Sequence, residues 1–219
     1  MAVDVAQAAR YYRQAADGGE VEAMAQLAAR LARGVGVPAD RAAAHRWYRR
    51  AAEGGHPVAM HDLGAALEFG LGVAQDEPEA RVWFTRGAER GNGSAMLRLG
   101  RMLEDGRGGP RDDVAAYRWY RRAADQGEPV GMYYVGLMLG NGRGVAPDAE
   151  QAVVWYRRAA DHGDPGGMIN LGLALAAGRG VSKDEAAARR LLQQAAASSH
   201  AEARGIAERL LRERGWPLR

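Results

Sequence analysis

Apolar side chains recur along the chain with the spacing of an α-helix. Methionine or leucine, replaced once by valine, stands at positions i, i+3 and i+7, so that all three share one helical face. Met24, Leu27 and Leu31 form this stripe first, and it returns every 36 residues until the copy that begins at Met168. The pattern predicts one amphipathic helix in each period, over about 21–33 in the first.

A second position with the same period carries an aromatic side chain in most copies. Its occupants are Tyr11, Trp47, Trp83, Trp119, Trp155 and Leu191. A small residue precedes this position by three and another follows it by four, as Ala44 and Ala51 do around Trp47. These positions share one helical face, where small side chains allow two helices to approach closely. The sequence therefore predicts an aromatic-bearing helix in each period, over about 4–17 in the first, and six helices of each type.

Aspartate residues precede the aromatic-bearing helices at a constant register. They are Asp4, Asp40, Asp76, Asp112, Asp148 and Asp184. A carboxylate at this place accepts hydrogen bonds from the free N–H groups of the first helical turn, so each is predicted to be an N-cap. Gln7, Glu79 and Gln151 follow their aspartates by three residues, a spacing that predicts a reciprocal capping box.

Glycine residues end the helices and also occur inside them. Each methionine-bearing helix is followed by Gly-x-Gly, first as Gly34 and Gly36, where a rapid chain reversal favours positive φ. A further glycine recurs within that helix at Gly64, Gly100, Gly136 and Gly172. Because a glycine inside a helix costs about 0.5–1 kcal/mol relative to alanine, its recurrence predicts a close crossing with the aromatic-bearing helix.

The repeated unit resembles the Sel-one-like repeat (SLR) family, a relative of the tetratricopeptide repeats. The resemblance is clearest in Leu-Gly-x-x-Leu-x-x-Gly-x-Gly-Val at 171–181, and in Asp followed by Ala-x-x-Trp-Tyr-x-Arg-Ala-Ala-x-x-Gly at 148–163. It implies an all-α, right-handed superhelical solenoid of antiparallel helix pairs, with the methionine-bearing helices on the concave side. It also implies that the protein assembles other proteins as an adaptor. Leucine stands where the family usually has tyrosine, at Leu31, Leu67, Leu103, Leu139 and Leu175.

The repeat predicts one solenoid domain over 1–219 with about twelve helices. Its predicted parts are a partial repeat 1–19, the repeats 20–55, 56–91, 92–127, 128–163 and 164–199, and a C-terminal capping helix 200–219. The last helix, predicted over about 201–214, replaces the apolar stripe with charged residues, as a terminal repeat requires. No signal peptide and no apolar run of membrane-spanning length is present, so a cytoplasmic location is expected by default.

The composition argues against catalysis and against bound cofactors. The chain has no cysteine, which excludes disulfides, thiolate metal sites and thiol nucleophiles. Its five histidines are scattered, without the His-x-x-x-His spacing of a metal site on a helix, and no Gly-x-Ser-x-Gly sequence occurs. We therefore expect no catalytic residue, no metal, no cofactor and no small-molecule substrate, and a protein or peptide as the partner.

The candidate partner-binding residues lie on the methionine-bearing helices, one, two or five positions after the methionine, away from the apolar stripe. We predict that they form one partner-binding patch in the C-terminal half of the concave groove. They are Leu97, Arg101, Tyr133, Tyr134, Leu137, Ile169 and Leu173. Exposed apolar patches often mark interaction sites, and tyrosine and arginine are frequent anchors in them. The alternative interpretation is that these side chains pack between neighbouring helices.

Two other functions remain open from the sequence. The first helix has no preceding repeat to cover Ala2, Val3, Val5, Ala6 and Ala9, so the solenoid would self-associate through its ends. Alternatively, a basic ridge would bind nucleic acid or an anionic membrane surface. Acidic residues at the helix ends and a net charge of only +3 favour locally paired surface charge instead. The ridge would consist of Arg13, Arg49, Arg121 and Arg157 together with Arg50, Arg86, Arg122 and Arg158.

Overall fold

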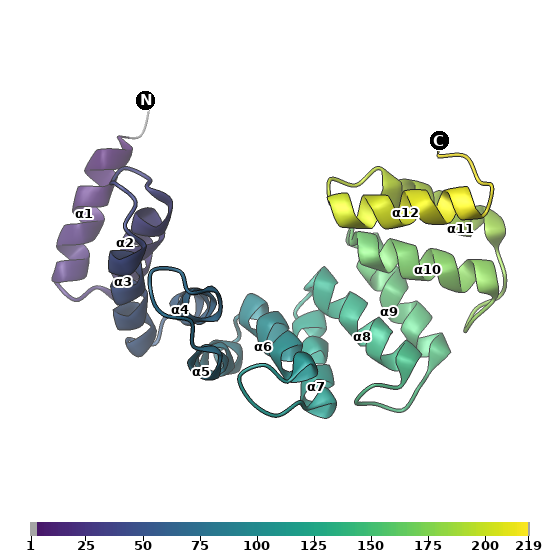
Figure 1. Cartoon of the computed structure of the whole chain (residues 1–219), viewed down its shortest axis with the longest axis horizontal. Coiled ribbons are helices and arrows are strands. Elements are labelled where there is room, and N and C mark those ends of the chain that lie inside the picture. The colour runs from purple at the N-terminus through teal and green to yellow at the C-terminus, as the bar shows by residue number, and fades with distance from the viewer. Residues whose placement is uncertain (1–3, 219) are drawn as a thin grey trace. The chain divides into compact units, whose positions relative to one another are not determined.

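The computed structural model describes residues 4–218, which form twelve α-helices and no strand (Figure 1). This confirms the all-α prediction and the expected six helices of each type. The aromatic position lies on α1, α3, α5, α7, α9 and α11, and the other helices alternate with them. Their bounds are α1 Val5–Asp17, α2 Val21–Arg33, α3 Arg41–Glu53, α4 Pro57–Phe69, α5 Glu77–Glu89, α6 Gly93–Asp105, α7 Asp113–Asp125, α8 Pro129–Asn141, α9 Ala149–Asp161, α10 Pro165–Ala177, α11 Glu185–Ala196 and α12 Ala201–Glu213.

The helices fall into two compact units, Met1–Arg111 with α1 to α6 and Asp112–Arg219 with α7 to α12. Within each unit, every helix packs against the next one along the chain. The methionine-bearing helices also contact one another, as α4 does with α6 in the first unit and α8 with α10 in the second. Each unit is therefore built by stacking successive helix pairs, while one continuous solenoid over 1–219 stays a prediction.

The predicted aspartate caps are confirmed. Asp40 Oδ1 accepts a hydrogen bond from Ala43 N at 2.8 Å, and Asp4, Asp76, Asp112, Asp148 and Asp184 cap their helices in the same way. The prediction of a reciprocal capping box is wrong. The N–H group of Asp76, which would donate the return bond, already donates to the carbonyl of Leu67 at 2.9 Å. Glu79 accepts from Trp83 Nε1 instead. In the other two copies, Gln7 donates to Tyr11 and Gln151 to Asp148 Oδ2.

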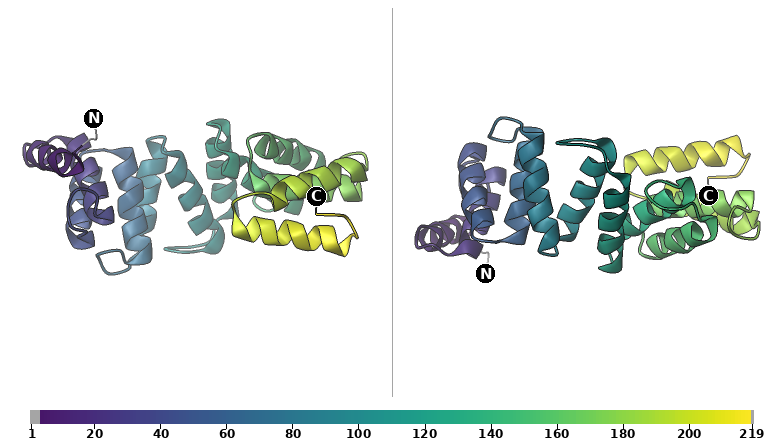
Figure 2. Two further views of the ribbon diagram at one scale, coloured as in Figure 1. Left: turned by 90° about the horizontal axis from the view of Figure 1, so that it is seen from above. Right: turned by 90° about the horizontal axis from the view of Figure 1, so that it is seen from below.

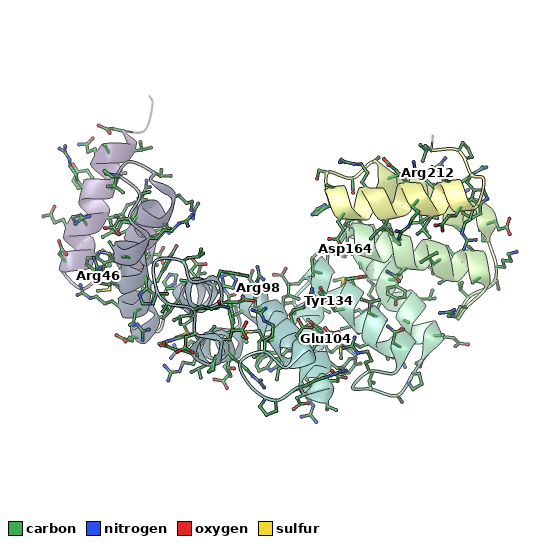
Figure 3. All side chains as sticks on the ribbon, viewed as in Figure 1. Arg46, Arg98, Glu104, Tyr134, Asp164 and Arg212 are labelled. Atoms are coloured by element: carbon green, nitrogen blue, oxygen red, sulfur yellow. The ribbon has the colours of Figure 1, made fainter. Side chains whose placement is uncertain are left out.

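The cap of α10 predicts a dependence of stability on pH. Asp164, shown at the start of α10 in Figure 3, accepts from Gly167 N at 2.7 Å, yet burial raises the pKa of its carboxyl. A pKa raised in the folded state gives stability below the ordinary aspartate pKa that is lost as the pH rises through the raised value. Asparagine caps a helix as well as aspartate does. We therefore expect Asp164→Asn to raise the thermal unfolding midpoint at pH 7, with no difference near pH 3.

Asp148 provides the matched control, since hydrogen bonds from Gln151 lower the pKa of its carboxyl. A lowered folded-state pKa gives stability above the ordinary value that is lost as the pH falls. Asp148→Asn should therefore lower the midpoint at pH 7. Equal shifts of the same sign in Asp148→Asn and Asp164→Asn, measured by circular dichroism, would contradict the explanation.

The glycines inside the methionine-bearing helices mark close helix crossings, as predicted. A Cβ atom on Gly64 would lie 2.9 Å from the ring of Phe84, and one on Gly136 would lie 2.6 Å from the ring of Tyr156. These rings belong to the residue after the tryptophan position. Phe84 is 0% exposed, whereas Trp47 is only half-buried. Trp83 and Trp155 are buried as well, each 5% exposed, so the second aromatic is distinguished by its packing on the crossing glycine.

The Gly-x-Gly loops reverse the chain over the start of the preceding aromatic-bearing helix. Gly178 and Gly180 both have φ of +68°, which confirms the predicted positive φ. A Cβ atom on Gly180 would collide with the carbonyl group of Ala149, the first residue of α9. Glycine at this point brings the middle residue of the loop, Arg179, beside the N-terminus of α9.

The first and last helices differ from the others in what covers them. On α1, Val5 and Ala6 are exposed, whereas Ala9 is buried, and Ala2 and Val3 lie outside the described residues. Self-association through this helix stays a prediction. On α12, only Ala207 and Leu211 are buried, and Figure 2 shows this helix in yellow at an edge of the second unit. No helix within residues 4–218 has the length and apolar character needed to cross a membrane.

Candidate functional site

The seven candidate residues lie on α6, α8 and α10. Leu97 and Arg101 belong to α6 of the first unit, where Leu97 is half-buried. Arg101 is exposed and its Nε donates to Asp105 Oδ2 at 3.3 Å, one turn further along the helix. The other five residues belong to the second unit.

Two of these five form an aromatic cluster at the first turns of α8. The ring of Tyr134 stacks on Tyr120 of α7 with centroids 4.5 Å apart, and the ring of Tyr133 lies 5.1 Å from Tyr134 (Figure 3 labels Tyr134). Gly166 at the start of α10 leaves room for Tyr133, since a Cβ atom there would lie 2.9 Å from that ring. Both tyrosines are half-buried, so their rings are fixed by packing and still reach the surface.

The expectation of an exposed side chain is wrong for Ile169, which is only 6% exposed. It packs in a cluster with Leu192 of α11 and with Ala207 and Leu211 of α12. The terminal helix α12 lies against α10 and covers this side chain. The helical periodicity of α10 alone does not reveal this contact. Leu173, one turn later, packs partly against the same cluster and stays half-buried.

Leu137 and Leu173 line a pocket of about 390 Å³ between α8, α9 and α10. Tyr156 and the small residues Gly140 and Ala149 also line it. The polar lining consists of Asn141, Asn170 and two arginines, Arg179 from the loop after α10 and Arg214 from the end of α12. The pocket thus combines an apolar wall with two cationic groups.

Tyr156 lies between the core and this pocket. Burial raises its pKa to about 12, so that it keeps its hydroxyl proton at neutral pH. Its ring packs on Gly136, and a Cβ atom on Gly140 would lie 3.3 Å from its hydroxyl oxygen. Tyr156 therefore adds an uncharged ring to the pocket wall, and the glycines on α8 leave space beside it.

A pocket occurs at the same repeat position in the first unit, three periods earlier. It has a volume of about 280 Å³ and is lined by Arg41, His45, Tyr48 and Asp62, among others. His61 Nδ1 lies 2.9 Å from the carboxylate of Asp62. This pocket therefore contains its own carboxylate, in contrast to the pocket of the second unit.

The equivalent place one period further, around Arg107, is filled by an ion-pair network. Arg107 donates to Glu68 Oε1 at 2.7 Å, and its Nε and Nη2 both donate to Glu77 Oε1, at 2.9 and 2.7 Å. The hydrogen bonds to Glu77 and Glu68 raise the pKa of Arg107. Glu68 is 2% exposed, and Arg98 Nη1 lies 3.9 Å from its other oxygen. The sequence interpretation missed this network, although the acids recur at fixed separations from the loop arginine.

Comparison with protein families accounts for the repeat. The Sel1 repeat model matches residues 1–20, 21–56, 57–92, 93–128, 129–164 and 165–200. The chain belongs to the Sel1 repeat family. Its repeats begin one residue later than the predicted boundaries of 20–55 and onward. Proteins made of Sel1 repeats generally act as scaffolds for protein–protein interactions, and their solenoid is typically non-catalytic.

Solved Sel1 repeat structures share the fold. The crystal structure of c5321, a protective antigen of uropathogenic Escherichia coli strains with an SLR fold, is 35% identical with a TM-score of 0.87. That match covers 96% of this chain but 45% of the antigen, so the chain spans less than half of the antigen's length. A Sel1 repeat protein from Oxalobacter formigenes is 26% identical with a TM-score of 0.83, covering 94% of this chain and 87% of that one.

More distant matches show the fold alone. The immunity protein Pa5087 from Pseudomonas aeruginosa is 22% identical with a TM-score of 0.55, over 84% of this chain and 68% of its own. A search of curated proteins finds no match. The comparisons therefore establish a Sel1 repeat solenoid and leave the partner to be inferred from this chain's own residues.

Six of the eight arginines of the predicted basic ridge make local contacts. Arg50, Arg86, Arg122 and Arg158 lie over the rings of Trp47, Trp83, Trp119 and Trp155, at 4.5, 4.6, 5.3 and 4.7 Å from the ring centroids. Arg49 pairs with Glu79 at 2.8 Å, and Arg121 pairs with Asp125 at 3.1 Å. These contacts favour the interpretation of paired surface charge. In the part of the chain that the structure describes, no group of three potential ligands is placed to hold a metal ion.

Proposed function

We propose that this chain is an adaptor that receives a segment of a partner protein in the pocket between α8, α9 and α10. The observation that carries the proposal is the pocket itself, because Leu137 and Leu173, expected from the sequence to contact a partner, both line it. Ligand sites in proteins are typically concave and apolar with a few placed polar groups. The general scaffolding role of Sel1 repeats supports a protein as the occupant.

The surface beside the pocket adds apolar area for a partner. Tyr133 and Leu137 stand four residues apart on α8, so they are neighbours on one helical face. Both are half-buried, and packing against α7 and α10 holds the tyrosine cluster in place. Rigid, partly exposed tyrosine and leucine side chains bind a partner with little loss of conformational entropy. The proposed contact surface therefore runs along α8 from Tyr133 to the pocket.

Peptide binding to the whole chain tests the proposal. Random twelve-residue peptides are selected on the immobilised protein, and the dissociation constant of the best peptides is measured by calorimetry. Leu137→Gln should weaken binding about tenfold or more, which corresponds to about 1.4 kcal/mol, because it removes apolar contact at the centre of the surface. Tyr133→Ala should weaken it as well.

Val154→Gln serves as the matched control. Val154 is an equally apolar residue on α9, 48% exposed, and it lines a different hollow together with Arg121 and Arg158. The control should leave peptide binding unchanged. If Val154→Gln weakens binding while Leu137→Gln does not, the partner contacts the arginine face, and the proposal is wrong.

A further inference from the structure

We propose that the pocket between α8, α9 and α10 binds the carboxylate of a glutamate or aspartate side chain in the partner segment, through Arg179 and Arg214. This inference rests on the proposed function and names the chemistry of the partner. The middle residue of the Gly-x-Gly loop occupies an equivalent position in every repeat. The inference compares the side chains around this residue from one repeat to the next.

The loop arginine of the first unit has two carboxylate partners from its own chain. Arg107 binds Glu68, near the end of α4, and Glu77, the first residue of α5, at distances of 2.7–2.9 Å. The glutamates come 39 and 30 residues before the arginine. In the loop after α8, Arg143 keeps the second of these partners, since its Nη2 lies 3.7 Å from Asp113, the first residue of α7.

At Arg179 both carboxylate positions have lost their acidic side chains. The residues 39 and 30 positions before it are Gly140 and Ala149. The backbone keeps the arrangement, because Gly180 sits on the carbonyl of Ala149 as Gly108 sits on that of Glu77. Removing the two acids therefore leaves the arginine in place and opens the space that they would fill.

That space is the pocket, since Gly140, Ala149 and Arg179 all line it. Arg179 is exposed, and among the described residues it has no ion-pair partner. No acidic side chain of the described chain lines the pocket, while Arg214 adds a second guanidinium group. Arg214 lies over the ring of Trp216 and within electrostatic reach of Glu185, which does not line the pocket. Arg179 is therefore the cation of the pocket without an internal counter-charge, and an anion from outside is its complementary occupant.

The apolar wall decides in favour of an acidic side chain of a protein. Leu137, Leu173 and Ala174 line the same pocket and suit the methylene groups that lead to a glutamate carboxylate. Arginine binds carboxylates through two parallel hydrogen bonds, and two nitrogens of Arg107 bind the Glu77 carboxylate on this chain. The partner would therefore supply in trans the carboxylate that the earlier repeat supplies in cis.

Ala149→Glu is the decisive variant because it restores the acid of the earlier repeat. Glutamate at the first position of a helix is favourable, and Glu77 already occupies the equivalent position. The variant should fold with an unchanged or raised thermal midpoint, and its new carboxylate should pair with Arg179. Peptide affinity should fall about tenfold or more, as it should in Arg179→Gln, because the cation is occupied or absent.

The matched probe is the selected peptide with its glutamate or aspartate replaced by glutamine or asparagine. This peptide should bind the parent chain at least about tenfold more weakly, and Ala149→Glu should not weaken it further. Affinity of the acidic peptide should fall as sodium chloride is raised. If selected peptides are sensitive to Leu137→Gln but carry no acid that matters, the carboxylate inference is wrong and the proposed function stands. If no selected peptide is sensitive to Leu137→Gln, both are wrong.

Inorganic phosphate provides the remaining arm of the experiment. Saturable phosphate binding that Ala149→Glu abolishes, together with peptides whose affinity does not depend on an acidic residue, would overturn the assignment to a protein carboxylate. Competition of phosphate with an acidic peptide, at millimolar phosphate only, agrees with a site shaped for a carboxylate on a longer segment.

Discussion

Phe84→Ala is expected to lower the free energy of unfolding by about 3–5 kcal/mol, the range for a large aromatic side chain removed from a packed core. Phe84 is 0% exposed, and its ring fills the space opened by Gly64 at the crossing of α4 and α5. His61 also contacts the ring, with centroids 5.7 Å apart. Alanine would leave a cavity that the backbone of Gly64 cannot close.

Urea denaturation followed by circular dichroism measures this effect. In stacked repeats, stability is a sum of terms from each repeat and its neighbours, so amide hydrogen exchange should accelerate first in α4 and α5. Val82→Ala is the control, because Val82 lies on the same helix and is 49% exposed. A loss below about 1 kcal/mol for Phe84→Ala would mean that the packing of this ring on Gly64 does not stabilise the repeat.

Arg107→Met is expected to lower the free energy of unfolding by about 3 kcal/mol, because it leaves the buried carboxylate of Glu68 without its principal partner. Methionine keeps much of the arginine stem, so the loss comes mainly from charge. The estimate stands at the low end of the range for broken buried pairs, since the side chain of Arg107 is 31% exposed and Arg98 lies 3.9 Å from Glu68.

A double-mutant cycle separates charge from packing in this network. Glu68→Met combined with Arg107→Met removes both charges, and replacing both partners of a buried pair by apolar groups is often nearly neutral. The double variant should therefore recover most of the stability lost in Arg107→Met. Additive losses in thermal or urea unfolding would show that the two side chains act independently.

The fold is predicted well from the sequence because local signals agree with one another in every repeat. The apolar stripe that begins at Met24, the caps such as Asp40 and the positive-φ glycines such as Gly34 all report the same helix boundaries. Agreement between propensity, pattern and turn chemistry is what makes a sequence specify one structure. The twelve helices follow from it.

The sequence does not show which aromatic residue packs on the glycine of the partner helix, since Trp83 and Phe84 are both buried. Trp83 and Phe84 are both apolar, and the choice depends on how far the partner helix approaches at Gly64. The burial of Ile169 is missed for a similar reason, since it depends on α12, whose own sequence has lost the repeat pattern. In both cases a tertiary contact decides what helical periodicity leaves open.

The candidate site is only partly predictable. The register of Leu137 and Leu173 predicts a common surface, and both line one pocket, while their role in partner binding stays a prediction. The pocket itself depends on Gly140, which has no side chain, and on Ala149, which has a small one. Within a single repeat, neither residue indicates a binding site. Comparison of the acids around Arg107 with their counterparts two repeats later would reveal it, once the contact is known.

The seating of each Gly-x-Gly loop on the preceding helix has a consequence for how such chains diversify. Arg107 and Arg143 take their acids from the repeat before them, and Arg179 faces Gly140 and Ala149 at the same positions, so inserting or deleting one whole repeat would change which arginine meets which acids. The backbone contacts would be conserved throughout, because every loop is seated in the same way. Gain or loss of a repeat would thus change which loop arginines are paired with acids and which can bind an external anion. No point substitution would be needed.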